Sequence, residues 1–321
     1  MTSPSPSRRG RRIAAAILRA LGGVLIAVWG AATVGFFALK AIPGDPVDVM
    51  LGVHAQVSES VKDQIRADWG LGEPLVVQYL SYLGRLVHGD LGTSYQLREP
   101  VSQVLTAQLP ATLSLAGLAI VIALVLSLTG ALIIRRPWAR SLASATELVL
   151  VSSPTFWVGL MLITVFSFKL GWFPVAGSGD FRALVLPAIT LALPLTGIIS
   201  QVLRQGLDAA SAQPFVLTAR ARGLDHTELI TRHTLRHAAA DSVTLTGYLV
   251  GSLVGGAVLI ETVFGRAGIG RVALRAIIDR DLPVVLGVIV LGALTFSVIN
   301  LLVDLAYTRL DPRQRLVGGA Q

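Results

Sequence analysis

Residues 215–240, FVLTARARGLDHTELITRHTLRHAAA, form a basic segment between two apolar stretches that are each long enough to cross a bilayer. The segment is too rich in Arg and His to lie in hydrocarbon. Its apolar spacing and its central Gly223 favour two short helices joined by a turn. The sequence therefore predicts a polar helical segment at one face of a membrane protein, where another protein can bind it.

The composition is that of an integral membrane protein. Of the 321 residues, 53% are hydrophobic and 14% are charged, whereas about a quarter of the residues in soluble domains carry a charge. The net charge of +8 would suit nucleic acid, but nucleic-acid binders display their basic residues on a soluble face. We therefore expect a lipid bilayer around the chain and no nucleic-acid partner. The absence of Cys excludes disulfides and thiolate metal ligands.

Apolar stretches of about 18 residues or more predict six membrane-spanning helices. The fourth is the weakest, because Pro187 and Pro194 interrupt it, yet prolines are tolerated in membrane helices. Pro154 predicts a kink in the third, where neighbouring hydroxyls can satisfy the freed backbone groups. The expected fold class is an all-α, polytopic membrane protein. In chain order the predicted spans cover residues 13–39, 109–134, 142–168, 184–203, 247–264 and 282–307.

The distribution of charge predicts the orientation of these spans. Arg residues flank the first, second, fourth and sixth spans on one side, which the positive-inside rule assigns to the cytoplasm together with both termini. The acidic residues of segment 40–108 outnumber its basic residues, as an exported region allows. One loop, 266–280, carries arginines on the side assigned to the exterior.

The expected organisation is one membrane domain with one exterior insertion. The apolar run after the basic N-terminus is too long for a signal peptide, so we expect a span there. The predicted parts are a cytoplasmic basic tail 1–12, the first span 13–39, an extracytoplasmic insertion 40–108, a core 109–315 that includes a cytoplasmic loop 204–241, and a cytoplasmic tail 316–321.

Two amphipathic helices are predicted within the insertion. Ser58 is a candidate N-cap for the first, whose apolar face includes Val61, Ile65 and Trp69. The second covers 76–87 and carries tyrosines suited to a membrane interface. We expect these helices to cap the outer mouth of the protein, with direct contact to a substrate as the alternative.

The order of motifs along the chain resembles the DppB/OppB branch of bacterial ABC importer permeases, which serve dipeptide, oligopeptide and nickel transport. The resemblance covers nearly the whole chain. Its motifs are IPGDPVDVML at 42–51, WGLGEPLVVQYLSYLGRLVHGDLGTSYQLREPV at 69–101, QLPATLSLA at 108–116, SSPTFWVGLMLITVFSFKLGWFPVAG at 152–177, ETVFGRAGIGRVALRAIIDRDLPVV at 261–285 and NLLVDLAYTRLDPRQR at 300–315.

The resemblance implies the type I importer permease fold of ABC transporters and makes the loop around Gly223 the region that docks on an ATP-hydrolysing subunit. The implied partners are a homologous second permease, two ATP-binding subunits and an extracytoplasmic substrate-binding protein. ATP and Mg would be bound by the partner subunits, and no cofactor is expected on this chain. The general EAA-x-x-x-G pattern of such loops is changed here, because Leu217, Thr218 and Ala219 precede Gly223 and the glutamate is missing.

The residues of this loop also have a direct physical interpretation. Small Ala219 and Ala221 permit a close approach of helices, and Gly223 can adopt a positive φ. Asp225 is a candidate N-cap, and the arginines can pair with acidic groups of a partner. His233 lies four residues before a second His, a spacing that can hold zinc, but no third ligand accompanies the pair. The candidate coupling residues are Thr218, Ala219, Arg220, Ala221, Arg222, Gly223, Leu224, Asp225, His233 and Arg236.

The function indicated is transport and not catalysis. The chain has no GxxxxGK[ST] loop, so its energy must come from another polypeptide. An intramembrane hydrolase is disfavoured, because every His lies outside the predicted spans. We expect a permease subunit of an ATP-driven peptide importer in the bacterial inner membrane. A nickel or other small-solute permease is the nearest alternative, and a membrane scaffold or sensor is a remote one.

Overall fold

The computed structural model describes residues 6–51, 57–134, 136–221, 223, 234–235, 247, 249, 251, 253 and 255–310. Within these residues the chain is helical, and its only pairing of β type is an isolated bridge between Thr93 and Pro100. The chain divides into a first unit, residues 1–110 with 271–298, and a second unit, residues 111–270 with 299–321. The expected all-α class is confirmed.

Four described helices are long and apolar enough to cross a membrane. They are α1 (Pro6–Lys40), α5 (Val101–Ile133), α8 (Arg182–Ser211) and α13 (Leu282–Leu310). Three of them cover a predicted span and extend beyond it, and α5 begins before the predicted span 109–134 and ends one residue short of it. The predicted basic tail 1–12 overlaps α1, which is already helical from Pro6. The predicted fifth span, 247–264, lies partly outside the described residues. Within its described part, residues 255–263 are helical.

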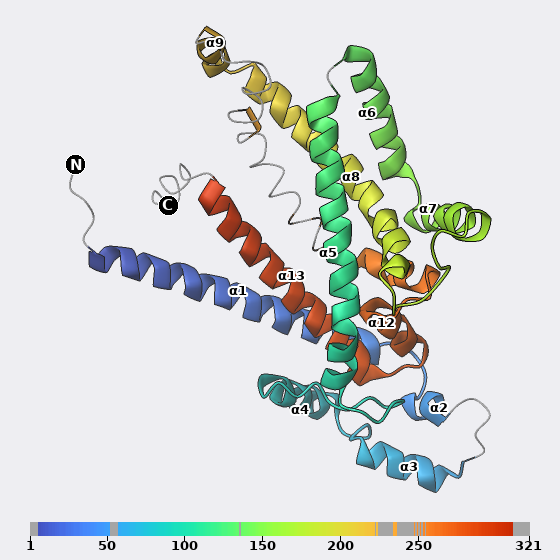
Figure 1. Cartoon of the computed structure of the whole chain (residues 1–321). Coiled ribbons are helices and arrows are strands. Elements are labelled where there is room, and N and C mark those ends of the chain that lie inside the picture. The colour runs from blue at the N-terminus through green and yellow to red at the C-terminus, as the bar shows by residue number, and fades with distance from the viewer. Residues whose placement is uncertain are drawn as a thin grey trace. The chain divides into compact units, whose positions relative to one another are not determined.

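The predicted third span is not one straight helix. It consists of α6 (Pro137–Ser152), α7 (Thr155–Leu162) and the π-helical turn η1 (Ile163–Lys169), and the chain bends by 102° between Ser152 and Thr155. Figure 1 shows α7 turned sharply away from α6. The Ser153 hydroxyl donates to the Val149 carbonyl at 2.7 Å. The expected kink at Pro154 and its use of a hydroxyl are confirmed, but the chain breaks there instead of bending gently.

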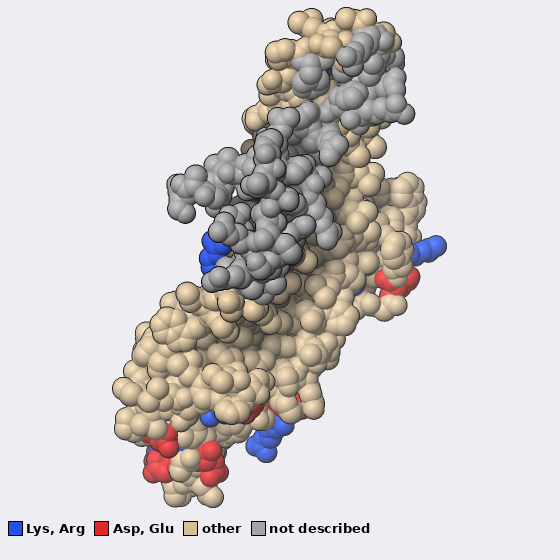
Figure 2. Space-filling model, turned by 90° about the vertical axis from the view of Figure 1, so that its left-hand side faces the viewer, with Lys and Arg blue, Asp and Glu red and all other residues tan. Residues whose placement is uncertain are grey.

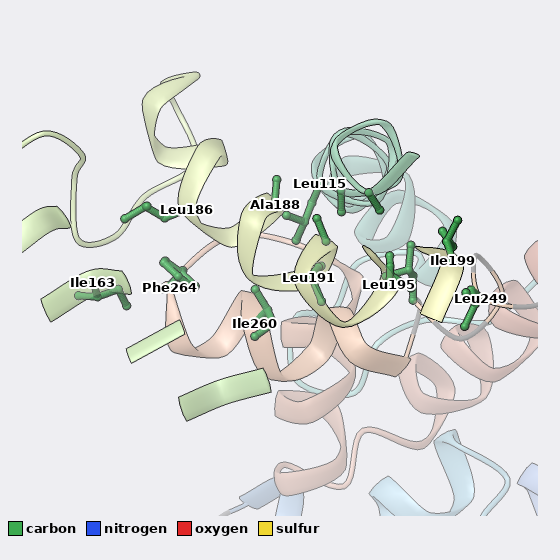
Figure 3. Packing of buried hydrophobic residues seen from close by; sticks show 14 residues of the cluster. Leu115, Ile163, Leu186, Ala188, Leu191, Leu195, Ile199, Leu249, Ile260 and Phe264 are labelled. Atoms are coloured by element: carbon green, nitrogen blue, oxygen red, sulfur yellow. The ribbon is translucent and has the colours of Figure 1, made fainter. Parts of the chain in front are cut away.

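The core of the second unit forms around α8. This helix runs unbroken through Pro187 and Pro194. In its apolar 18-residue stretch, 61% of the residues are buried. Leu191, Leu195 and Ile199 recur at helical spacing along its buried face and contact apolar side chains from α5 and residues 249–264 (Figure 3). Both α6 and α7 pack against α8. Among the four membrane-length helices of the described residues, the weakest span by sequence is therefore the most buried, with Pro187 buried and Pro194 half-buried.

Three helices form the apolar centre of the first unit. Phe36 of α1 and Tyr82 of α4 (Leu75–Val87) stack at 5.7 Å, and Leu286 and Val290 of α13 complete the cluster. The Tyr79 hydroxyl shares a 2.8 Å hydrogen bond with that of Thr33. Both predicted helices of the insertion are present. We find that α4 is bound to the ends of two long helices through its aromatic face.

Two short helices, α2 (Pro46–Leu51) and α3 (Glu59–Asp68), carry the charged part of the first unit. Acidic side chains gather at the end that carries α3 (Figure 2). Ser58 occupies the N-cap position of α3 as predicted, but its side chain makes no capping bond and instead contacts Ser60 at 2.9 Å. A final helix, α12 (Ile269–Ile278), precedes α13.

Candidate functional site

The described part of the predicted coupling loop is a short helix and a turn. Helix α9 (Pro214–Ala221) follows α8 after a break at Ala212 and Gln213. Proline suits the first position of a helix, where its missing N–H is not needed. Gly223 follows with φ +81°, which confirms the expected left-handed conformation. The loop therefore leaves α8 through a second, separate helical turn.

Helix α9 has one buried face and one exposed face. Val216 is buried, whereas the Leu217 side chain is 73% exposed and Thr218 is exposed beside it. An exposed leucine at the start of a segment expected to bind a partner is a candidate contact residue. Sequence reasoning did not include Leu217 among the coupling residues. Its signal was an apolar side chain next to Thr218 in an otherwise polar stretch.

The predicted coupling residues fall into two groups. Thr218, Ala219 and Ala221 lie in α9 with Arg220, and Gly223 forms the turn after it. The remaining candidates lie outside the described residues. These are Arg222, Leu224, Asp225, His233 and Arg236.

A polar network joins α6 to the α9-proximal part of α8. The Arg204 guanidinium donates to the Glu147 carboxylate, to the Ser144 hydroxyl at 3.0 Å and to the Arg140 carbonyl at 3.2 Å. Arg140 in turn forms an ion pair with Asp208 at 3.1 Å. Sequence reasoning used Arg140 and Arg204 only as orientation signals. Their pairing across helices depends on tertiary contacts that residue spacing does not encode.

This network ties the end of α8 nearest to α9 to a second helix. Helix α8 is continuous from the buried cluster to its end at Ser211, three residues before α9 begins. Arg204 and Asp208 hold that end of α8 to α6. A force on α9 would therefore act on two packed helices together, as rigid elements joined by polar contacts can transmit it.

Comparison with known families identifies most of the chain. Residues 119–316 match the family described as the binding-protein-dependent transport system inner membrane component. Residues 13–116 match the N-terminal region described for the membrane components of such systems.

Curated relatives align over nearly their whole length. A Brucella abortus protein named as a permease of a peptide transport system is 37% identical over 291 residues, which are 87% of this chain and 92% of that protein. The oligopeptide transport system permease protein AppB of Bacillus subtilis is 34% identical, covering 88% and 94% of the two chains. The glutathione transport system permease protein GsiC of Escherichia coli is 32% identical, covering 93% and 98%.

Solved structures share the fold. A chain of an amino acid ABC transporter crystallised with histidines superposes with a TM-score of 0.51 at 19% identity, over 64% of this chain and 92% of that chain. A chain of the methionine ABC transporter MetNI in an inward-facing conformation gives 0.51 at 16% identity, over 64% and 95%. Together with the family match, these likenesses lead to one conclusion. The chain belongs to the family of inner membrane components of binding-protein-dependent transport systems, as a multi-pass, non-enzymatic subunit that works with a binding protein and an ATPase.

Proposed function

We propose that this chain is the membrane-spanning permease subunit of an ATP-driven importer for di- or oligopeptides. The observation that carries the proposal is the set of near full-length relatives named for peptide transport, at 34% and 37% identity. The relative named for glutathione fits the same class, because glutathione is itself a tripeptide. The chain would form the path, and the substrate would arrive on an extracytoplasmic binding protein.

The proposed topology has six spans in the bacterial inner membrane with both termini in the cytoplasm. It rests on the basic flanks of the apolar segments and on the four or five membrane-length helical elements of the described residues. Segment 40–108 would then face the exterior, and loop 204–241 the cytoplasm. The binding protein would approach segment 40–108.

The proposed coupling site is loop 204–241, with α9 and Gly223 at its start. Two ATP-binding subunits, holding ATP and Mg, would bind this loop and its counterpart in a homologous second permease. ATP binding would favour one of two conformations of the assembly, because a ligand shifts an equilibrium by its differential affinity for the two states. The α6–α8 network around Arg204 supports this role, since it connects the end of α8 to a second helix.

The substrate class is tested by uptake into liposomes that contain the reconstituted complex. Dipeptides, longer peptides, glutathione and nickel are offered in turn, and ATP hydrolysis is recorded with each. Peptide uptake that requires ATP and the binding protein supports the proposal. Uptake of nickel without uptake of any peptide would overturn it.

The coupling role is tested at Gly223. Proline holds φ at about −65°, which is incompatible with the φ of +81° at this position. We expect Gly223→Pro to insert and assemble but to lose ATP-driven uptake. Gly223→Asn is the matched control, because Asn tolerates positive φ and no atom of the described residues would lie within 4 Å of an added Cβ there. Equal uptake by the proline and asparagine variants would contradict the coupling role.

A further inference from the structure

The first unit contains a cavity of about 500 Å³ that the proposed coupling scheme does not use. Its walls come from the end of α1, the end of α3 with the loop after it, one face of α4, the loop 90–95 and the start of α13. All of these segments belong to one compact unit. The volume is within the range of small-molecule sites, about 300 to 1,000 Å³.

Charged side chains of both signs line this cavity without pairing to one another. Lys40 and Arg85 lie on the wall, as do Asp68 and Glu73, and none of the four forms an ion pair with the described residues. Asp90 also lines the cavity, and one of its carboxylate oxygens accepts the Gly92 amide at 2.8 Å. These charges are available to a ligand.

Other cations of the same insertion behave differently. Lys62 binds Asp48 at 2.8 Å, and Arg66 binds Asp45 and Asp63, each at 2.5 Å. None of these five residues lines the cavity. The insertion thus pairs the charges that hold α2 to α3 and leaves those on the cavity wall unpaired.

The wall also carries aromatic side chains and a hydrogen-bonding group without a partner. Trp69 and Tyr95 form an edge-on pair with ring centroids 4.7 Å apart. Tyr82 is 6% exposed, and its buried hydroxyl has no hydrogen-bond partner. Burial raises the pKa of both tyrosines to about 12, so their hydroxyls remain protonated donors. A buried hydroxyl without a partner is costly unless a ligand or water satisfies it.

We propose that this cavity is a binding site for a short zwitterionic peptide, placed on the insertion ahead of the membrane path. The inference rests on the proposed function and adds to it a location for the substrate. Lys40 and Arg85 hold the peptide carboxylate, and the acidic residues hold its ammonium group. Trp69 and Tyr95 contact an apolar side chain. The Tyr82 hydroxyl supplies a further hydrogen bond.

The mixture of charges selects this ligand class over a phosphate group. An anionic phosphate headgroup would be attracted by Lys40 and Arg85 but repelled by Asp68, Glu73 and Asp90. A zwitterion with an apolar side chain uses both signs of charge and the aromatic wall together. A dipeptide is also small enough for the volume.

The test measures dipeptide binding to the purified full-length chain in nanodiscs by isothermal titration calorimetry, with alanyl-phenylalanine as the probe. We expect Arg85→Gln to weaken binding about tenfold, as loss of a charge-assisted hydrogen bond would. The C-terminal amide of the same dipeptide should bind weakly to the native chain and lose nothing further with Arg85→Gln. An amide that binds as tightly as the acid would overturn the inference.

Two controls separate binding from folding. Tyr82→Phe should weaken dipeptide binding, whereas Tyr79→Phe, on the same helix but outside the cavity, should change stability through Thr33 and leave affinity unchanged. Lys62→Gln removes a cation of the same insertion outside the cavity and should also leave affinity unchanged. Equal losses from Tyr79→Phe and Tyr82→Phe would contradict the assignment.

The outcome is distinguishable from failure of the proposed function. If the reconstituted complex imports peptides but the isolated chain binds none at millimolar concentration, the cavity inference is wrong and the importer stands. If Arg85→Gln weakens docking of the binding protein and not of the dipeptide, the cavity belongs to that interface, and the inference is again wrong.

Discussion

Each unit of the chain contains a deeply buried carboxylate, and the two are satisfied in different ways. In the first unit, Asp281 is 3% exposed and accepts the Ser94 hydroxyl at 2.5 Å and the amides of Tyr95 and Gln96 at 3.1 and 3.3 Å. In the second unit, Glu261 is 0% exposed and accepts the Thr112 hydroxyl at 2.6 Å. That hydroxyl accepts the Ile269 amide at 2.9 Å.

Both carboxylates accept a hydroxyl that in turn accepts a backbone amide, because the Ser94 hydroxyl accepts the Leu97 amide at 2.9 Å. The difference is that Asp281 also contacts two backbone amides of a distant loop directly. It stands immediately before α13, where a negative charge is favourable to the helix dipole. Glu261 reaches the Ile269 amide through a relay hydroxyl, and Gly268 provides the space, because an added Cβ there would collide with the Glu261 carboxylate. Removing Asp281 therefore breaks more hydrogen bonds than removing the relay hydroxyl of Thr112 does.

The largest effect is expected from Asp281→Ala. This change leaves a buried hydroxyl and two amides without their acceptor, and we expect it to lower the free energy of unfolding by about 3 kcal/mol. Denaturant unfolding of the purified chain, followed by Trp fluorescence, measures the change. Asp279→Ala is the control, because its ion pair with Arg275 is exposed and should contribute less than about 0.5 kcal/mol. Similar losses for the two variants would show that the buried hydrogen bonds of Asp281 stabilise the fold no more than the exposed ion pair of Asp279 does.

A smaller effect is expected from Thr112→Val, which keeps the shape of the relay and removes its hydroxyl. We expect a loss of about 2 kcal/mol, since Glu261 and the Ile269 amide each lose one hydrogen bond. Thr106→Val on the same helix is the control, because the Thr106 hydroxyl is exposed and bonds only to its own helix. A loss at Thr112 as large as that at Asp281 would show that the two direct amide contacts of Asp281 add no stability beyond that of a relayed carboxylate.

The sequence predicted four membrane-length helices of the described residues and a kink at Pro154, because both depend on local features. Long apolar runs require a helix in lipid, and proline removes a helical hydrogen bond, which favours a kink although α8 continues through two prolines. The positive φ of Gly223 followed from glycine's freedom for the same reason. The partners of the buried carboxylates could not be predicted in this way, because they come from distant parts of the chain. Ser94 lies 187 residues from Asp281, and no local pattern links them.

The location of the candidate site stays a prediction from the small residues and glycine that form α9 and its turn. Leu217, Glu147 and Arg204 were not assigned to the site from the sequence. An exposed leucine and an interhelical ion pair are recognised only once the helices are packed. The cavity of the first unit was likewise hidden, because its wall combines five segments from residues 36 to 286.

The smallest expected effect concerns a third carboxylate, Asp45, whose side chain is only partly covered. Burial alone would raise the pKa of Asp45, but hydrogen bonds from Arg66 and the Val47 amide outweigh it and lower the pKa below its ordinary value of 3.8. A lowered pKa in the folded state stabilises the fold above the unfolded pKa, and this contribution is lost as the pH falls through the folded value.

We therefore expect unfolding measured between about pH 5 and about pH 3 to show a loss of stability that Asp45→Asn reduces, by less than about 1 kcal/mol. Asp68→Asn is the control, since Asp68 forms no ion pair with the described residues. Equal acid sensitivity in the native chain and in Asp45→Asn would show that the contact with Arg66 does not stabilise the charged carboxylate. In that case burial would determine the pKa of Asp45. A partly covered carboxylate of the first unit would then gain no stability from its hydrogen bonds, in contrast to the buried Asp281.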